Sequence, residues 1–264
     1  MHVYLIFPRT FEAIVFIICA YLLKIKDKKP NHPGYEIYKS LLSAFIIWIF
    51  YMIVDILVPI VAPLSFRTET LDFGALDAVT FMGYLTEYPS LFAANVMRDM
   101  QSVLAAIFII STNKIAFITK YGCEKGLKMF KRKIRYIIYA LSSLLIVLFD
   151  TTGVIIYENF SVETIYYFNN GAVLGMLTFL VVITKACGIL IAEYIKGRDL
   201  LSDSERRLLK LFCLGYSFLA IGMWYWIIIP LIIPNHKRLI FQSIGHFVWS
   251  LAPVTLYMAL KGKN

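Results

Sequence analysis

Cysteine, histidine and charged residues are scarce in this sequence, and their scarcity excludes several kinds of site. The 264 residues include four cysteines and four histidines, and only 16% are charged. No Cys-x-x-Cys spacing occurs among Cys19, Cys123, Cys187 and Cys213, so we expect neither a disulfide framework nor a cysteine metal site. His246 is the one histidine inside an apolar segment, so we predict no metal centre.

Long hydrophilic stretches are also absent. The connections between the apolar segments are all much shorter than the roughly 50 residues of a small soluble domain. We therefore expect residues 1–264 to form one transmembrane domain, and any binding or sensing chemistry to lie in that domain or its connections.

Apolar and aromatic side chains are abundant, at 59% and 16% of all residues, well above the composition of an ordinary soluble domain. The apolar residues gather in seven segments: 3–23, 41–64, 91–119, 134–156, 172–195, 208–233 and 239–260. Each reaches or exceeds the roughly 20 residues that an α-helix needs to cross a membrane. Because unpaired peptide groups are unfavourable in lipid, spanning segments must be helical. The sequence predicts an all-α fold, a polytopic membrane protein with a seven-helix transmembrane bundle.

Lysine and arginine residues gather in alternate connections. The first, third and fifth connections and the C-terminal tail are basic, whereas the second and fourth are mainly acidic. The short sixth connection, with Lys237 and Arg238, is the exception. Basic connections lie on the cytoplasmic side, so we predict an outside N-terminus, a cytoplasmic C-terminus and a place in the cell membrane. The net charge of +9 then indicates anionic lipids at the cytoplasmic face as partners, and no nucleic acid.

Two local signals refine the segments. Ser202-Asp203-Ser204-Glu205 is typical of a capping box, which predicts a helix start at this point. Pro253 lies deep in the last segment, where its ring and missing N–H predict a kink.

Ionisable residues inside spanning segments are costly, so they are the best pointers to function. With a rise of 1.5 Å per residue, several such residues fall in the outer half of the bilayer on five different helices. We predict that they form an outward-facing polar pocket, with two tryptophans in its wall. The predicted residues are Glu12, Asp55, Asn95, Arg98, Asp99, Asp150, His246, Trp224 and Trp249.

The predicted pocket has a structural alternative. Arg98 and one or two carboxylates could form ion pairs that only fasten the helices, while Glu12 and Asp150 extend to the headgroups. Closer to the cytoplasmic side, Lys185 and Asn113 are the predicted inner polar groups. For Lys185, extension to the inner interface or pairing with a carboxylate is favoured over a role as a Schiff-base nucleophile.

Seven helices with an outside N-terminus, and Arg98 within the third helix, resemble the general plan of microbial rhodopsins and seven-helix receptors. The resemblance is one of topology. Microbial rhodopsins attach retinal to a lysine in the seventh helix, and segment 239–260 contains none, so we predict no retinal and no other cofactor. Segment 91–119 also lacks the acidic-arginine-aromatic triplet of G-protein-coupled receptors.

Three classes of function remain. The first is a receptor or sensor whose polar pocket binds a ligand or a proton and whose basic cytoplasmic loops contact a signalling partner or a second copy of the chain. The second is a proton or cation transporter or channel that uses the same carboxylates. The third is an intramembrane enzyme acting on lipid, with a carboxylate or His246 as general base. Enzyme activity ranks last because the sequence has no paired histidines and no serine motif.

Overall fold

The computed structural model describes residues 2–25, 34–61, 89–156, 162–168, 170–197, 200–232 and 235–261. The helices are α1 (His2–Ile25), α2 (Tyr35–Val61), α4 (Pro89–Tyr121), α5 (Cys123–Phe130), α6 (Lys133–Phe149), α7 (Asn170–Gly197), α8 (Asp203–Ile232), α9 (Asn235–Trp249) and α10 (Leu251–Lys261). The strands are β1 (Asp150–Ile156) and β2 (Val162–Phe168).

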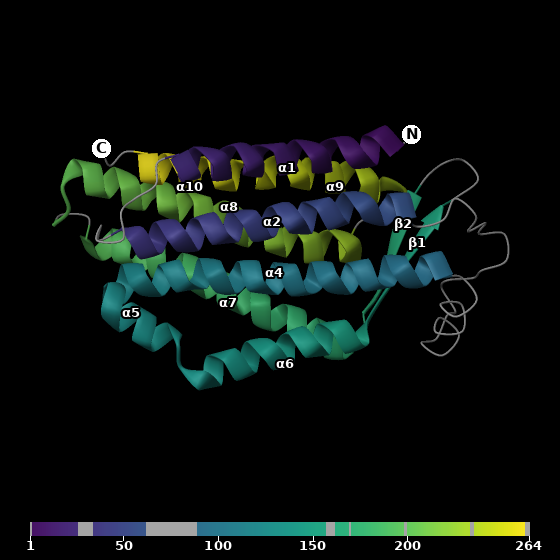
Figure 1. Ribbon diagram of the computed structural model, residues 1–264, viewed down its shortest axis with the longest axis horizontal. Coiled ribbons are helices and arrows are strands. Elements are labelled where there is room, and N and C mark those ends of the chain that lie inside the picture. Colours follow the sequence, from purple (N-terminus) through teal and green to yellow (C-terminus); the bar gives the residue numbers. More distant parts are fainter. Residues whose placement is uncertain are drawn as a thin grey trace.

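Six helical stretches in the described residues are long and apolar enough to cross a membrane, by length and composition. They are Ile6–Ile25, Tyr35–Val58, Asp99–Tyr121, Leu174–Gly197, Asp203–Tyr225 and Ser243–Lys261. Figure 1 shows the long helices side by side along the long axis of the molecule. This arrangement confirms the expected bundle of membrane helices, with six such stretches against the seven segments predicted.

The fourth predicted segment is where the structure differs. Helix α6 has 17 residues and ends at Phe149, and the chain continues as β1, which pairs antiparallel with β2. The prediction of a helix over 134–156 is therefore wrong for its last seven residues. Residues 151–156 contain β-branched threonine, valine and isoleucine around Gly153, and such side chains fit a pleated strand better than a helix.

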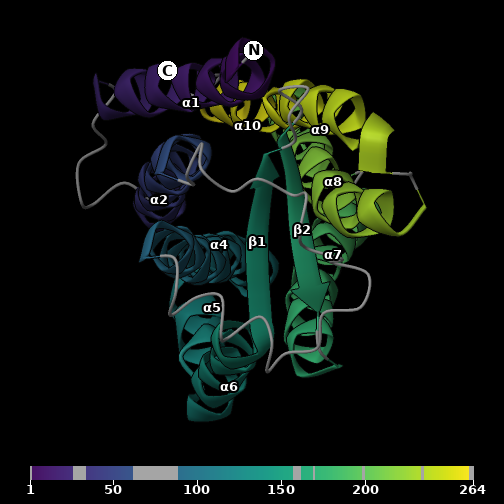
Figure 2. The same cartoon turned by 90° about the vertical axis from the view of Figure 1, so that its right-hand side faces the viewer.

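The hairpin of β1 and β2 lies across one end of the bundle (Figure 2). Figure 1 shows that α1 begins at this end and that the mark for the C-terminus lies at the other. Strand β1 contacts α4, and β2 contacts α7 and α9. The hairpin therefore joins helices that are distant in the sequence.

The two local signals are confirmed. Helix α8 begins at Asp203, directly after Ser202, whose backbone N–H donates to Glu205 Oε2 at 3.2 Å, while the Glu205 N–H donates to Ser202 Oγ at 3.4 Å. The last segment is broken at Ser250, between α9 and α10. Because Pro253 has no N–H and its ring would clash with the carbonyl of Trp249, one turn earlier, the helix breaks where the sequence predicts.

Close packing of α8 against α9 and α10 depends on glycine. A Cβ atom added at Gly222 would lie 2.3 Å from Cε3 of Trp249, and one added at Gly215 would lie 2.6 Å from Cγ of Leu256. Glycine at these positions lets the helix backbones approach. Trp249 is fully buried against α8 as a result.

Candidate functional site

Arg9 on α1 and Asp55 on α2 form an ion pair inside the bundle. Arg9 Nε donates to Asp55 Oδ2 at 2.5 Å. The two residues are only 6% and 4% exposed, so the pair is shielded from solvent. A buried ion pair is held at a high desolvation cost, and loss of either partner leaves the other charge uncompensated.

Glu12 joins three helices. Its Oε1 accepts a hydrogen bond of 2.6 Å from Trp48 Nε1 on α2, and its Oε2 lies 2.5 Å from His246 Nδ1 on α9. Glu12 is 1% exposed and His246 3%. Glu12 thus accepts from the indole N–H of Trp48, whereas the donor in its contact with His246 depends on which ring nitrogen of His246 carries a proton.

Two tryptophans complete the arrangement. The Trp48 ring stacks on the Trp249 ring, with centroids 4.9 Å apart and an interplanar angle of 4°. Trp48 also stacks on Tyr51 at 4.3 Å. Within the described residues, the buried Nε1 of Trp249 has no hydrogen-bond partner. We call the six residues Arg9, Glu12, Trp48, Asp55, His246 and Trp249 the Glu12 cluster.

Helical spacing explains why these side chains meet. Arg9 and Glu12 are three residues apart on α1, and His246 and Trp249 are three apart on α9. Residues three or four apart share one helix face. The contact between Glu12 and His246 and the stack of Trp48 on Trp249 are therefore successive contacts along one helix junction.

The formal charges of the Glu12 cluster depend on one proton. Glu12 and Asp55 contribute two negative charges and Arg9 one positive charge, so the sum is −2 + 1 = −1 when His246 is neutral. A proton on His246 brings the sum to zero. Charge inside a membrane protein is strongly unfavourable unless it is paired.

Contacts join three of the predicted pocket residues, Glu12, His246 and Trp249, the last through Trp48. A fourth, Asp55, pairs with Arg9, three residues before Glu12 on α1. Asp99 lies on α4 and is half-buried. The backbones of Asn95 and Arg98 belong to α4, and that of Asp150 begins β1. Their side chains lie outside the part of the structure that is described.

Trp224 lies elsewhere. Its Nε1 donates to Thr184 Oγ1 on α7 at 3.0 Å, and the side chain is 38% exposed. The structure thus places it on the surface of the α7–α8 pair. It does not share the buried surroundings of Trp249.

Sequence reasoning missed Arg9 and Trp48. Arg9 lies in the first turns of the first apolar segment, and its spacing of three from Glu12 was the signal that could have paired them. Trp48 was indistinguishable from the other apolar residues of its segment, because nothing in the sequence tells which helix faces Glu12.

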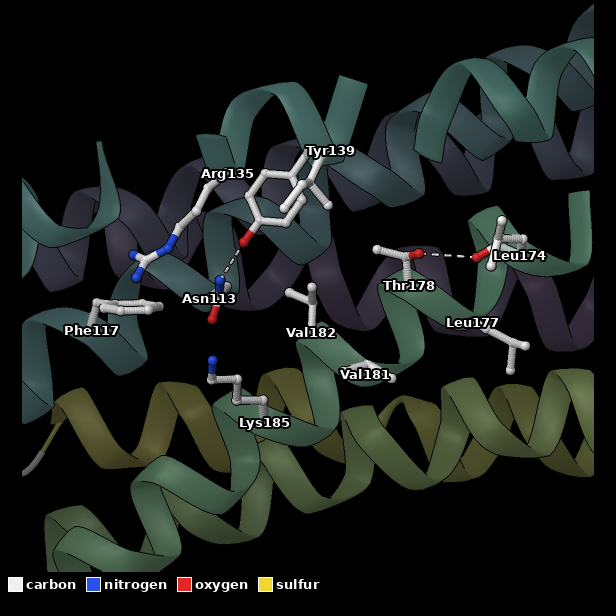
Figure 3. Close-up of a pocket in the computed structure, with 11 residues that line it drawn as sticks. Asn113, Phe117, Arg135, Tyr139, Leu174, Leu177, Thr178, Val181, Val182 and Lys185 are labelled. Carbon is white, nitrogen blue, oxygen red and sulfur yellow. Dashed lines mark hydrogen bonds between the residues drawn. The ribbon is translucent and has the colours of Figure 1, made fainter. Parts of the chain in front are cut away.

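The two predicted inner polar residues lie around a second feature, a cavity of about 470 Å³ between α4, α6 and α7 (Figure 3). Asn113 Nδ2 donates to the Tyr139 hydroxyl at 2.7 Å. Arg135 lies over the Phe117 ring, 4.0 Å from its centroid. Figure 3 shows the Lys185 side chain pointing toward Asn113.

Buried apolar residues of α1, α2 and α4 adjoin the Glu12 cluster, and we call them the apolar layer. It consists of Phe16, Phe45, Phe108 and Ile109, each no more than 3% exposed. Phe16 and Phe45 meet edge to face at 5.4 Å, and Phe108 lies 4.7 Å from the Trp48 ring. On α4 the layer occupies the turn that precedes Asn113, so the two polar regions do not merge on this helix.

The fold and the buried charges indicate a class, that of a helical integral membrane protein. Comparison with protein-family models, curated proteins and solved structures found no match to this chain. Within the described ranges, no three side chains of histidine, cysteine, aspartate or glutamate are grouped as metal ligands.

Proposed function

We propose that this protein is a receptor or sensor of the cell membrane, with its N-terminus outside and its C-terminus in the cytoplasm, and that the Glu12 cluster is its switch. The observation that carries the proposal is the contact of 2.5 Å between Glu12 on α1 and His246 on α9. This contact lies one turn before the break at Ser250. Glu12 therefore contacts the part of α9 that adjoins the break between α9 and α10.

Binding of a proton is the stimulus that best fits a carboxylate in contact with a histidine. When His246 carries a proton, its contact with Glu12 is a charge-assisted hydrogen bond, which contributes about 1.5–3 kcal/mol. A difference of about 1.4 kcal/mol changes an equilibrium between two conformations tenfold. Gain or loss of one proton is therefore enough to shift the helices between two arrangements. A small ligand that pairs with the same side chains would act in the same way.

A shift of α9 can reach the cytoplasmic end of the bundle through the helices that pack together. Helix α10 continues from the break at Ser250 and packs on α8, with Leu256 directly against Gly215. Helix α8 begins with exposed basic residues, among them Arg207 and Lys210. By the positive-inside rule this end faces the cytoplasm. A cytoplasmic signalling partner with an acidic surface would bind here.

Transport is the second candidate, because buried carboxylates and a histidine also serve proton pathways. The apolar layer favours the sensor. A path for protons or cations would have to pass Phe108 and Ile109 to reach Asn113 and Lys185, and both layer residues are buried. A switch needs no such path, since it only has to change its charge and move.

The deciding experiment uses purified protein in liposomes and a step in external pH. In a variant that lacks Trp224 and Trp226, the fluorescence of Trp48 and Trp249 reports on the Glu12 cluster. We expect this fluorescence to change with pH, and the change to disappear in Glu12→Gln. Glu36→Gln, which removes a carboxylate paired with Lys114 outside the cluster, is the control and should keep the response.

Flux is measured on the same liposomes. A sensor should give no proton or cation flux in the wild type or in Asp55→Asn. Flux in the wild type that Asp55→Asn abolishes would establish the transporter instead. A fluorescence response that survives Glu12→Gln unchanged would contradict the proposed switch.

A further inference from the structure

We propose that the cavity between α6 and α7 binds one anionic phospholipid of the membrane. Its phosphate lies between Arg135 and Lys185, and one acyl chain follows Leu177 and Val181 on α7. This inference concerns the second polar region and does not depend on the function proposed for the Glu12 cluster.

The polar end of the cavity carries two cations and no acid. Its lining residues are Asn113, Phe117, Arg135, Ile138, Tyr139, Leu174, Leu177, Thr178, Val181, Val182 and Lys185, among which there is no aspartate or glutamate. Within the described residues, Lys185 makes no salt bridge and no hydrogen bond. Two positive groups that face one cavity without a counter-ion call for an anion.

Arg135 is held in place for this role. Its guanidinium carbon lies 4.0 Å from the Phe117 ring centroid, and Nη1 donates to the backbone carbonyl of Met129. Within the described residues, this is the one hydrogen bond of the guanidinium. Arginine binds phosphate through several N–H groups in a fixed plane, so a guanidinium held in this way and the Lys185 ammonium, both lining one cavity, suit a phosphate.

The other end of the cavity is apolar and open to the bilayer. Leu174, Leu177 and Val181 are 58%, 42% and 61% exposed. Their spacing of three and four places them in one stripe along α7. On the opposing helix, Ile138 is 43% exposed and lines the same cavity. A water-soluble anion gains nothing from contact with these apolar side chains, whereas an acyl chain packs against them.

The positions of the two cations give the lipid a direction. Lys185 lies near the middle of the apolar stretch Leu174–Gly197, whereas Arg135 lies in the first turn of α6, next to the basic connection from α5. The phosphate therefore enters from the end of the bundle at which α6 begins, and the acyl chain runs from Lys185 along the stripe toward Leu174. By the positive-inside rule that end faces the cytoplasmic leaflet, which is rich in anionic lipids.

The test measures lipids that remain bound to the full-length protein in native mass spectrometry after extraction in detergent. Phosphatidylglycerol and phosphatidylcholine of identical acyl chains are added in turn. We expect one tightly bound phosphatidylglycerol per chain and about tenfold weaker binding of phosphatidylcholine. Equal binding of the two lipids would overturn the proposal.

Variants then locate the site. Lys185→Gln should weaken phosphatidylglycerol binding about tenfold, and Lys185→Arg should restore it. Lys196→Gln removes an equal charge from the same helix outside the cavity and is the matched control. Because Arg135 also makes structural contacts, Lys185 is the primary position for the charge test. If Lys185→Gln binds as the wild type does, or if Lys196→Gln loses as much binding, the site is not the one proposed.

A second variant tests the acyl-chain part with both cations retained. Val181→Trp fills the groove on α7 and should abolish tight binding of phosphatidylglycerol. Inorganic phosphate at millimolar concentration should not displace the lipid from the wild type. Unchanged binding in Val181→Trp, or displacement by phosphate alone, would reject a lipid as the occupant.

Discussion

The rings of Trp48 and Trp249 lie nearly parallel with centroids 4.9 Å apart, and Trp48 contacts the carboxylate of Glu12. Trp48 donates its only N–H to that carboxylate, and Trp249 lies three residues after His246, which contacts the other carboxylate oxygen. The junction of α1, α2 and α9 is therefore polar on one turn and aromatic on the next. Any change at Glu12 must disturb both layers of contact.

The fit of Trp249 against α8 predicts a strong effect of Gly222→Ala. The added methyl carbon would lie 2.3 Å from the indole ring, so the ring must move. We expect a loss of stability of about 1–3 kcal/mol, measured as a lower midpoint of thermal unfolding in detergent. Gly188→Ala is the control, because a Cβ atom there meets nothing within 4 Å. Equal midpoints for the two variants would show that Trp249 is not packed as described.

The buried pair of Arg9 and Asp55 predicts a large asymmetry between single and double variants. Arg9→Gln leaves Asp55 buried without this partner and should cost about 3–5 kcal/mol. The double variant with Asp55→Asn removes both charges and should recover a substantial part of that loss. A double-variant cycle of unfolding free energies checks this. Additive losses would mean that the two side chains are not coupled.

The break before Pro253 predicts that Pro253→Ala weakens the switch. Alanine restores the N–H that can donate to the carbonyl of Trp249, so α9 and α10 can join into one helix. We expect a smaller pH-dependent change in the fluorescence of Trp48 and Trp249, with no fall in the unfolding midpoint. Val254→Ala alters the exposed neighbour and should leave the response intact. A full response in Pro253→Ala would exclude the break as a hinge.

The bond from Asn113 to Tyr139 predicts that Tyr139→Phe destabilises the contact of α4 with α6. Removal of the hydroxyl leaves a buried amide N–H without its acceptor and should cost about 1–3 kcal/mol. Tyr136→Phe removes a hydroxyl from an exposed side chain on the same helix and should stay within about 0.5 kcal/mol of the wild type. The thermal unfolding midpoints of the two variants, measured under the same conditions, test this prediction.

The sequence predicts much of this architecture because membrane helices leave a strong signal. Lengths of apolar runs gave the main helices, and the rarity of charge inside them drew attention to Glu12, Asp55 and His246. Depth in the membrane could not pair them, however, since it says nothing about which helices are neighbours. Arg9 and Trp48, the actual partners of Asp55 and Glu12, became visible only once α1 and α2 were placed side by side.

Asp150 shows a second reason why the sequence could not predict the whole structure. A short run of apolar residues has the same sequence pattern whether it forms a helix or a buried strand, so the spacing of apolar residues could not distinguish the two. The β-branched residues Thr151, Thr152 and Val154 were the available signal for a strand. They were outweighed by the length of the run as a whole. The fourth segment was consequently extended as a helix through residues that belong to β1.

The apolar layer of Phe16, Phe45, Phe108 and Ile109 has an electrical consequence. Where water is excluded, a transmembrane voltage falls most steeply, and these four side chains are almost fully buried. One elementary charge carried across a full 100 mV changes in energy by about 2.3 kcal/mol. In the switch that we propose, a proton that reaches His246 from one side of the membrane crosses only part of that drop, and a fraction of this energy is enough to bias the switch. The Glu12 cluster would then register membrane potential together with acidity.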